Sequence, residues 1–485
     1  MSKPKVVIAG ATGFVGRWLV DTYRERWDIT ALTRDRVVEE TPGIQWKTVN
    51  LFSYRSVQEV LEGADYAIYL IHSMQPSTQL HQASFQDTDL FLGDTFGRAA
   101  ASQNLKQIVY LGGTLPKDKH SWSKHLKSRY EVECALGDYG VPVTALRAGI
   151  VVGPDGSSFS MLRKLIERLP ILACPSWTKN QTQAISLTTI VEAFGAVLGN
   201  PAAYDQPIEL GGPEKITYLK LLKTTARVLG KRRLYLLLPF NVLNLSKFWL
   251  SLITGASKEL ADPLVDSLKH DMKANPESDQ LIRDQITYRS LEDAIRYATT
   301  ETYRPKLPKK ESTGYTKNTV RSMQRFVNPK GKDAIWVANA YKEWLPIYFK
   351  SIIQVKADRN NNFNFYILRI PWPILKLKYV AERSSENRQL FLVAGGLLAR
   401  TIDMDTGYLE FRTVLNQTTI LTAIHEFIPR LPWFVYTKTQ ALAHLFVMKR
   451  FGNYLKKYDP SIERREISAT ETLDIKGAKS VETAT

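Results

Sequence analysis

A glycine-rich turn between an apolar run and a helical pattern is the feature that most constrains this fold. Val6 to Ala9 form a short apolar run, and Gly10-Ala11-Thr12-Gly13-Phe14-Val15-Gly16 follows it directly. The apolar spacing beyond the turn predicts a helix from Phe14 to Tyr23. A strand that turns at once into a helix is the first part of a βαβ unit, so the chain is expected to build a parallel sheet.

The first 150 residues repeat this alternation of strand-like and helical patterns. Helical segments such as Phe91 to Ala101 separate most of the further apolar runs, which are Ile29 to Leu32, Tyr66 to Ile71, Ile108 to Leu111 and Val143 to Leu146. We therefore predict an α/β fold with a doubly wound parallel sheet, that is, a Rossmann domain. Helices expected at Ser157 to Arg168 and Ile190 to Leu198 predict an extended lobe at the carboxyl edge of that sheet.

The glycine turn predicts a binding site for the pyrophosphate of a dinucleotide. Its glycines allow close backbone approach, and the free N–H groups at the start of the helix favour a negative charge. The spacing is G-x-x-G-x-x-G and not the G-x-G-x-x-G of many dehydrogenases. Thr33 and Arg34 at the end of the second strand favour NADP, because a cation there accommodates a 2′-phosphate; the adjacent Asp35 leaves NAD open.

The pattern changes after a segment rich in proline and basic residues, Arg304 to Gly314. We predict an NAD(P)-binding domain with its substrate lobe at 1–300, a linker at 301–316, a second domain at 317–458 and a disordered tail at 461–485. Alternation around Leu375 to Tyr379 and Leu409 to Arg412 predicts an antiparallel sheet with one solvated face.

Two further features describe the expected second domain. A turn at Asp358 to Asn362 predicts a hairpin of Ile352 to Ala357 with Phe363 to Ile370, and one long helix is expected over about Trp433 to Tyr458. Gly395-Gly396 would bend a strand and widen the interior, which favours an apolar pocket between sheet and helix.

Composition and charge exclude several classes of protein. Hydrophobic residues at 44% and charged residues at 23% exclude a wholly disordered chain, and two cysteines exclude a disulfide framework. No apolar run spans a bilayer, since polar residues interrupt Leu234 to Ile253. We therefore expect a cytoplasmic protein, with a peripheral position at the inner membrane face left open.

The basic surplus is concentrated in the C-terminal part of the chain. Residues 301–485 hold 30 Lys and Arg against 17 Asp and Glu, a surplus of 13 out of the total of 17. Such a surface suits anionic lipid or an acidic protein partner, and charge alone does not choose between them. We do not expect nucleic acid as a partner, and the sequence does not predict an oligomeric state.

Several short motifs together carry a resemblance to a known family. They are Tyr69-Leu70-Ile71-His72-Ser73-Met74, Tyr110-Leu111-Gly112-Gly113, His125-Leu126-Lys127-Ser128-Arg129, Leu146 to Gly153 and Gly211-Gly212-Pro213. With these and the glycine turn, the chain resembles the extended and atypical short-chain dehydrogenase/reductases, which include nucleoside-sugar epimerases and NmrA-like sensors. It looks like a bacterial subgroup in which this domain is fused to a domain of unassigned function, similar to helix-grip (START-like) ligand carriers. The resemblance extends to about residue 458.

The resemblance also implies candidate catalytic residues. The family uses Tyr-x-x-x-Lys on one helix to exchange a proton while nicotinamide exchanges a hydride. Here His125 stands in the tyrosine place and Arg129 in the lysine place, four residues apart on one helical face. Histidine can exchange a proton near neutrality, whereas arginine stays charged and can bind ribose or phosphate.

The remaining implied contacts to the cofactor come from the ends of two strands. They are Leu70, Ile71 and His72 at the end of the Tyr66 to Ile71 run and Gly112 and Gly113 in the turn after the Ile108 to Leu111 run, beside Gly10, Thr12, Gly13, Phe14, Val15, Gly16, Thr33 and Arg34. No metal site is expected, because His425 and His444 lack spaced partners.

These observations predict an NAD(P)-dependent oxidoreductase of atypical short-chain type that acts on a small apolar or lipid-like molecule. Two alternatives stay open. Loss of both Tyr and Lys favours a non-catalytic NADP-binding sensor or assembly factor. The basic C-terminal part favours a lipid or hydrophobic ligand-binding protein that uses its second domain.

Overall fold

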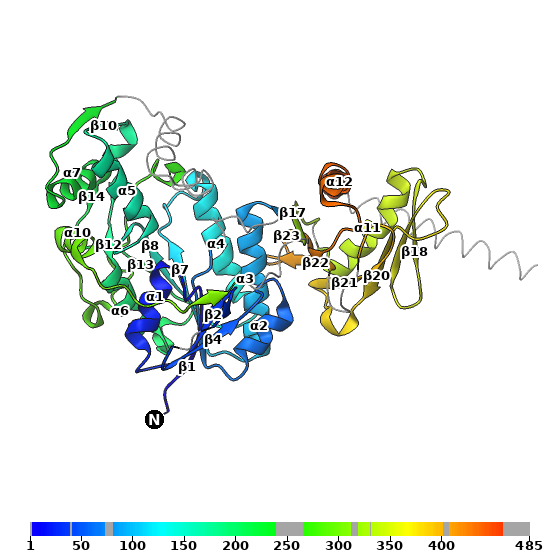
Figure 1. The fold of residues 1–485 in the computed structure, drawn as a ribbon, viewed down its shortest axis with the longest axis horizontal. Helices are drawn as coiled ribbons and strands as arrows, with labels where there is room; N and C mark the ends of the chain where they lie inside the picture. Colours follow the sequence, from blue (N-terminus) through cyan, green and yellow to red (C-terminus); the bar gives the residue numbers. More distant parts are fainter. Residues whose placement is uncertain are drawn as a thin grey trace, which may run out of the picture. The chain divides into compact units, whose positions relative to one another are not determined.

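The computed structural model describes residues 2–38, 41–72, 81–238, 265–311, 319–329, 331–400 and 407–458. The chain divides into two compact units, Met1–Lys317 and Asn318–Thr485, drawn in Figure 1 in blue to green and in yellow to orange. The expected tail at 461–485 lies outside the described residues. The same holds for the apolar segment Leu234 to Ile253 from residue 239 onward. Among the helices that are described, none is long and apolar enough to cross a membrane.

A seven-stranded sheet forms the centre of the first unit. Its order is β13-β8-β7-β5-β1-β2-β4, and every neighbouring pair is parallel. The chain winds outward from β1 in both directions, so the predicted doubly wound sheet is confirmed. The strands are β1 (Lys5–Ala9), β2 (Asp28–Thr33), β4 (Ile44–Thr48), β5 (Tyr66–Tyr69), β7 (Gln107–Gly113), β8 (Val143–Ala148) and β13 (Pro207–Leu210).

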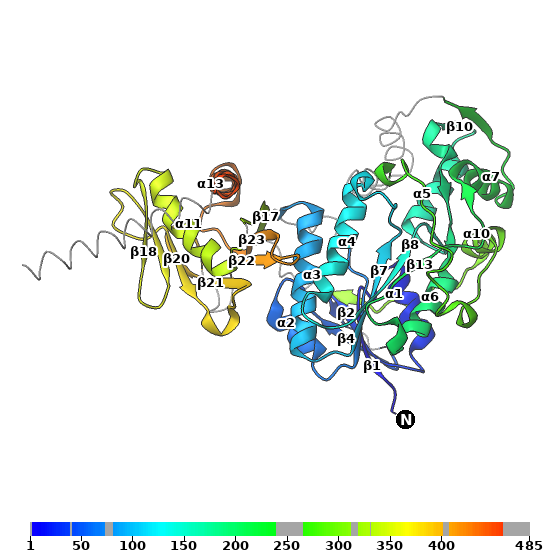
Figure 2. The same cartoon turned by 180° about the vertical axis from the view of Figure 1, so that it is seen from behind.

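Helices cover both faces of this sheet, as Figures 1 and 2 show. One face packs against α1 (Phe14–Tyr23) and α6 (Leu187–Val197), and the other against α2 (Tyr54–Leu61), α3 (Phe85–Ser102) and α4 (Lys124–Gly137). The α3–α4 contact is close because of Gly97, where an added Cβ would lie 2.7 Å from the carbonyl oxygen of Ala135. The sheet is therefore buried on both sides, which explains why its strands read as apolar runs.

An extended lobe follows β8, as predicted. It packs α5 (Ser157–Arg168), α7 (Tyr218–Val228) and α10 (Leu291–Thr300) around a separate apolar core that includes Phe159, Leu221 and Ile295. Short two-stranded ladders complete it: β9 (Val151–Val152) with β12 (Ile185–Ser186), β10 (Ile171–Cys174) with β15 (Leu234–Leu237), and β11 (Gln181–Thr182) with β14 (Ile216–Thr217).

The segment after α10 lies along the first unit. Tyr303 Oη donates a hydrogen bond to Asp21 at 2.9 Å, and Arg304 Nε donates one to Asp155 at 2.8 Å. Further on, β16 (Lys310–Glu311) pairs antiparallel with β3 (Arg36–Val37). Residues 301–311, which we expected as a linker, are thus held by side-chain and backbone contacts.

An antiparallel sheet with the order β18-β19-β20-β21-β22-β23-β17 forms the second unit. Helix α11 (Ala334–Tyr348) and the C-terminal helix α13 (Gln440–Lys457) pack on it, so the predicted fold class is confirmed. The predicted hairpin is also confirmed, as β18 with β19. The strands are β17 (Val320–Val327), β18 (Ile353–Ala357), β19 (Phe363–Ile367), β20 (Leu375–Tyr379), β21 (Arg388–Gly395), β22 (Tyr408–Val414) and β23 (Thr419–Phe427).

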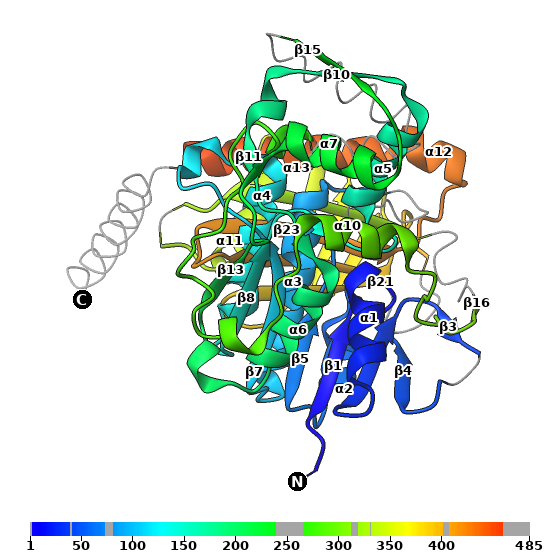
Figure 3. The same ribbon diagram turned by 90° about the vertical axis from the view of Figure 1, so that its left-hand side faces the viewer.

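The predicted long C-terminal helix is divided in two. Figure 3 shows α12 (Trp433–Lys438) followed by α13, and the break falls at Thr439, whose φ of −125° and ψ of −82° are not helical. Thr439 Oγ1 donates to the carbonyl oxygen of Val435 at 2.7 Å. Such local bonding of a threonine side chain competes with helical geometry.

Aromatic rings fill the layer between this sheet and its helices. Phe451 of α13 lies 5.1 Å from Tyr341 and 5.4 Å from Trp344 of α11, measured between ring centroids. Tyr341 in turn lies 5.5 Å from Phe411 of β22. These rings occupy the space where the sequence favoured an apolar pocket.

The role expected of Gly395 and Gly396 is also different in the structure. Both have positive φ, at 123° and 117°, and an added Cβ on Gly396 would lie 2.5 Å from the carbonyl oxygen of Ile374. Gly396 therefore lets the chain after β21 lie directly on the backbone before β20, instead of widening the interior.

The expectation of one solvated face is wrong for β22. Glu410 and Arg412 are fully buried, because Glu410 accepts hydrogen bonds from Arg388 Nε at 2.8 Å and Arg412 Nη2 at 2.9 Å and contacts His425 Nε2 at 2.9 Å. Burial opposes ionisation of Glu410, but the charges of Arg412 and Arg388 outweigh it and hold the pKa well below its usual range. Alternating charge on a strand predicts exposure only when the charges lack partners.

We expect Phe451→Ala to lower the free energy of unfolding of the second unit by about 3 to 5 kcal/mol, because it removes a ring at the centre of the aromatic layer. Phe446→Ala on the same helix is the matched control, since Phe446 is 45% exposed. Urea denaturation followed by circular dichroism measures both variants. Equal losses of stability would contradict the assignment of Phe451 to the core.

Candidate functional site

The glycine turn forms a close-packed cradle at the carboxyl end of β1. Gly10 has φ of +90°, and an added Cβ there would lie 3.0 Å from Cβ of Leu70. The N–H of Gly13 donates to the carbonyl oxygen of Gly10 at 2.9 Å. At Gly16 an added Cβ would lie only 2.2 Å from that same oxygen, so α1 can start this close to the turn only with glycine.

The start of α1 fits a pyrophosphate group. Gly13 is the N-cap residue, and no side chain caps the helix there. The N–H groups of the first turn are therefore directed to whatever lies in front of the helix, where the helix dipole favours an anion. A cradle that any Cβ would fill, together with an uncapped helix start, is what a bound dinucleotide requires.

The other predicted residues of the turn have different environments. Thr12 is half-buried in the turn, Val15 is buried in the core, and Phe14 packs so closely that an added Cβ on Gly156 would lie 2.9 Å from its ring. The side chains of Val15 and Phe14 therefore position the helix, and only the backbone of these residues is directed to the cradle.

The ends of β2, β5 and β7 meet at the same edge as the glycine turn. Leu70, Ile71 and His72 follow β5 there, as predicted. Gly112 and Gly113 are the last residues of β7, paired with Arg147 and Ala148. We expected these two glycines in the turn beyond the strand. That expectation is wrong, because the pairing of β7 with β8 continues to the end of β7.

Two histidines lie side by side at this edge. The ring centroids of His72 and His125 are 5.0 Å apart, and His72 Nδ1 lies 2.7 Å from Oδ2 of Asp89 on α3. Since a carboxylate accepts, we assign the proton to Nδ1, which leaves Nε2 with its lone pair. Within the described residues, His72 Nε2 and His125 Nδ1 are buried and have no hydrogen-bond partner.

Both histidines are held in the neutral form. Burial is the main cause that lowers the pKa of His72; the positive charge of Arg129 adds to it, and Asp89 opposes it. The pKa of His125 is lowered well below its usual value, again mainly by burial and further by His72 and Arg129. The expectation that His125 titrates near neutrality is therefore corrected, and its ring stays neutral at pH 7.

Arg129 is bound to the ends of two strands. Its guanidinium donates to the carbonyl oxygens of Ile71, at 3.4 Å, and of Leu111, and it lies 4.9 Å over the ring of Tyr110. The side chain therefore links the segment after β5 to the end of β7. Tyr130, the next residue, lies instead against Trp122, with ring centroids 5.1 Å apart.

Lys310 is a candidate binding residue that sequence reasoning missed. Strand β16 places Lys310 opposite Val37, just beyond Arg34 at the end of β2. Burial lowers the pKa of Lys310, Asp35 opposes this shift, and the positive charge of Arg34 adds to it. Two cations from distant parts of the chain thus meet where a 2′-phosphate is expected. The only signal was the run of basic residues in the supposed linker.

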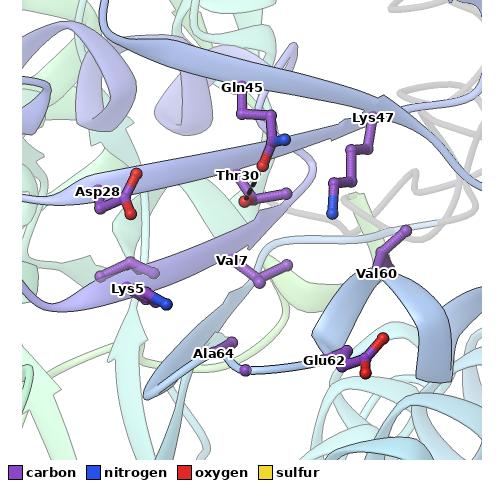
Figure 4. Close-up of a pocket in the computed structure, with 11 residues that line it drawn as sticks. Lys5, Val7, Asp28, Thr30, Gln45, Lys47, Val60, Glu62 and Ala64 are labelled. Atoms are coloured by element: carbon purple, nitrogen blue, oxygen red, sulfur yellow. Dashed lines mark hydrogen bonds between the residues drawn. The ribbon is translucent and has the colours of Figure 1, made fainter.

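A hollow of about 140 Å³ lies elsewhere in the first unit, near the amino-terminal ends of β1 and β2. Figure 4 shows it between the strands and the end of α2, with Lys5, Asp28 and Glu62 at its wall. Ligands of doubly wound sheets bind at the opposite edge, so we do not assign it to the site. The described ranges contain no cluster of three or more potential metal-ligating side chains. His444 lies in the second unit, where burial lowers its pKa to about 4.

Comparison with known proteins agrees with this geometry. Residues 6–178 match the NAD dependent epimerase/dehydratase family. The match lies within the first unit and does not reach the second. The auxiliary protein GraX of Staphylococcus aureus is 30% identical over 145 residues, which are 29% of this chain and 43% of that protein. The chain therefore spans less than half of that relative.

Solved structures resemble part of this chain at low sequence identity. A nucleoside-diphosphate-sugar epimerase from Staphylococcus aureus is 15% identical with a TM-score of 0.48, over 60% of this chain and 99% of that one. An NADPH-dependent quinone oxidoreductase from Escherichia coli is 17% identical with a TM-score of 0.47, over 60% and 98%.

We expect Gly13→Val to abolish dinucleotide binding without unfolding the protein, because a branched side chain would stand in front of α1. Gly16→Val should also abolish binding, and it should lower the free energy of unfolding by about 1 to 3 kcal/mol through overpacking against Gly10. Calorimetric titration with NADPH and thermal melts measure both effects. Normal binding by Gly13→Val would mean that the cradle is not the dinucleotide site.

Proposed function

We propose that the first unit is an NADP-dependent oxidoreductase in which His72 and His125 handle the proton that accompanies hydride transfer. The observation that carries the proposal is the pair of buried, unpartnered nitrogens, His72 Nε2 and His125 Nδ1, within the described site. When bound, the cofactor supplies the hydride. The residues of this chain bind it, orient the substrate oxygen and exchange the proton.

The side chains of Asp89, His72 and His125 have different roles in this proposal. Asp89 holds the tautomer of His72 through the 2.7 Å contact at Nδ1, so that Nε2 can accept a proton. His125 presents Nδ1 beside it, within the 5.0 Å ring contact. A buried polar atom without a partner costs about 1 to 3 kcal/mol, and a substrate hydroxyl or carbonyl that pairs with it recovers that cost.

Arg34 and Lys310 favour NADP over NAD. A 2′-phosphate carries negative charge, and two cations at the end of β2 give it charge-assisted partners. Without the phosphate the two cations repel one another. Burial is the main cause of the lowered pKa of Lys310, and Asp35 opposes that shift more than Arg34 adds to it.

An apolar substrate is favoured by the surface of the extended lobe. Ile171 of β10 and Leu234 and Leu236 of β15 are each more than half exposed. Large apolar side chains grouped on one small ladder are typical of a surface that binds an apolar molecule. We do not propose the alternative in which the second unit binds a hydrophobic ligand. The rings around Phe451 occupy the layer between the sheet and the helices of that unit.

We expect the protein to bind NADPH more tightly than NADH by about 10- to 150-fold for each charge-assisted contact. Arg34→Ala and Lys310→Ala should each reduce the preference, and the double variant should remove it. Lys309→Ala is the matched control, because neighbouring residues of an extended segment point to opposite sides. Calorimetry with both cofactors decides; an unchanged preference in the double variant would disprove the assignment.

We expect His72→Ala and His125→Ala to reduce turnover by about 10² to 10⁴ with little change in NADPH affinity, since general acid–base catalysis has that magnitude. His120→Ala, at an exposed histidine, should have no effect. The readout is NADPH oxidation with a panel of apolar quinones and ketones.

The pH dependence of turnover tests the same assignment. Because the pKa of His72 is lowered, its neutral form persists below pH 6.5. In the direction of alcohol oxidation by NADP, in which Nε2 accepts the proton, turnover should therefore stay level through that value and fall only at lower pH. A fall centred on the ordinary histidine pKa would contradict the burial of this site.

The second candidate is a non-catalytic NADP sensor. It is favoured by Arg129, whose guanidinium is committed to the carbonyl oxygens of Ile71 and Leu111 where the family uses a lysine for catalysis. Tight NADPH binding with no NADPH oxidation above background, in the wild type and in both histidine variants alike, would favour the sensor over the enzyme.

A further inference from the structure

One end of the sheet in the second unit carries exposed apolar residues and basic residues together. Four segments meet there: 347–353, 366–376, 396–400 and 428–438, which we call the basic rim. Hydrogen bonds join them. Leu368 N donates to Ile352 O at 2.8 Å, Leu397 N to Pro373 O at 3.2 Å, and Arg430 N to Leu398 O at 3.1 Å.

Large apolar side chains of the rim stand in solvent. Trp372 is 65% exposed and Phe434 is 68% exposed. Other exposed members are Ile352, Leu368, Leu397 and Trp433. Contiguous exposure of this kind is uncommon in a protein without a binding partner, because it leaves apolar surface in water.

The backbone holds Trp372 outward. Pro371 and Pro373 flank it, and proline fixes its own φ and restricts the residue before it. Gly396 packs against Ile374, so the neighbouring segment supports the same loop from the side. The indole is therefore presented on a stiff loop and does not fold back onto the sheet.

The charge of the rim has one sign. Its four segments contain six basic residues, all exposed, and no Asp or Glu. They are Lys350, Arg369, Lys376, Arg400, Arg430 and Lys438. Asp403 and Asp405, in the next connection, lie outside the described residues.

We propose that the basic rim docks the protein on an anionic membrane surface. Tryptophan and other apolar side chains enter the interfacial region of a bilayer, where an indole finds both apolar and polar surroundings. Arginine and lysine beside them contact anionic headgroups, each worth about five-fold in affinity. An acidic protein would account for the charges, but a flat fluid interface better accommodates apolar side chains presented from four separate segments.

The test uses the full chain and flotation with vesicles of phosphatidylcholine, alone or mixed with anionic phosphatidylglycerol. Binding should be at least about ten-fold stronger to the mixed vesicles and should weaken with salt. Trp372→Ala/Phe434→Ala and Arg369→Glu/Arg430→Glu should each reduce it by about ten-fold or more. Since these positions are exposed, thermal melts should match the wild type.

Matched controls lie at the opposite end of the same sheet. Lys356→Glu/Arg359→Glu changes net charge by the same amount, and Val327→Ala removes an exposed apolar group there. Both should keep vesicle binding. Equal loss in the charge controls would overturn the proposal, because it would mean that net charge alone attracts the protein.

A second measurement tests whether Trp372 enters the bilayer and uses a variant that still binds vesicles. Brominated lipid should quench tryptophan emission, and Trp372→Phe should remove part of that quenching while flotation is retained. No vesicle binding, or rim variants that change only the oligomeric state in light scattering, would overturn the proposal in favour of a protein partner. None of these measurements involves NADPH, so their outcome is independent of the proposed oxidoreductase activity.

Discussion

The approach of α1 to the turn after β1 is the contact on which the candidate site depends. An added Cβ on Gly16 would lie 2.2 Å from Gly10 O, so no other residue allows this approach without movement of the backbone. The same turn packs Gly10 against Leu70 at the end of β5. Through this pair of contacts the cradle fixes the place of His72, two residues further along.

In the proposed mechanism, burial of two histidines takes the part that a tyrosine and a lysine have in the family that the sequence resembles. A lysine near a tyrosine stabilises phenolate, whereas Arg129 here stabilises the ends of β5 and β7 through their carbonyl oxygens. Its charge also helps to keep both histidines neutral. A neutral imidazole whose tautomer is fixed by a carboxylate can accept a proton at one defined atom, which is the property that proton exchange needs.

Much of this structure follows from local sequence, and the rest depends on contacts between distant segments. The bounds of α1 and α5 could be predicted because buried faces impose a helical period. In contrast, β4 (sequence IQWKT) is a half-exposed edge strand without an apolar run, and it was missed. The buried charges of Glu410 and Arg412 could not be foreseen, because their partners lie on other strands.

The candidate site shows the same division. The glycine turn, Arg34, His72 and His125 were each named from motif order and strand ends, but the contact between the two histidines was not predicted. Lys310 was not, because only the pairing of β16 with β3 places it beyond Arg34. The neutral state of His125 was also inaccessible, since burial is set by the tertiary structure.

The most direct test of this account is nitrogen NMR of histidine side chains during titration with NADPH. The chain has seven histidines, and His425 and His444 in the second unit serve as internal references. The account predicts that the resonances of His72 and His125 are those of neutral rings at pH 7 and shift when NADPH binds, while the two references do not. Saturable binding of NADPH without any change at His72 and His125 would contradict it.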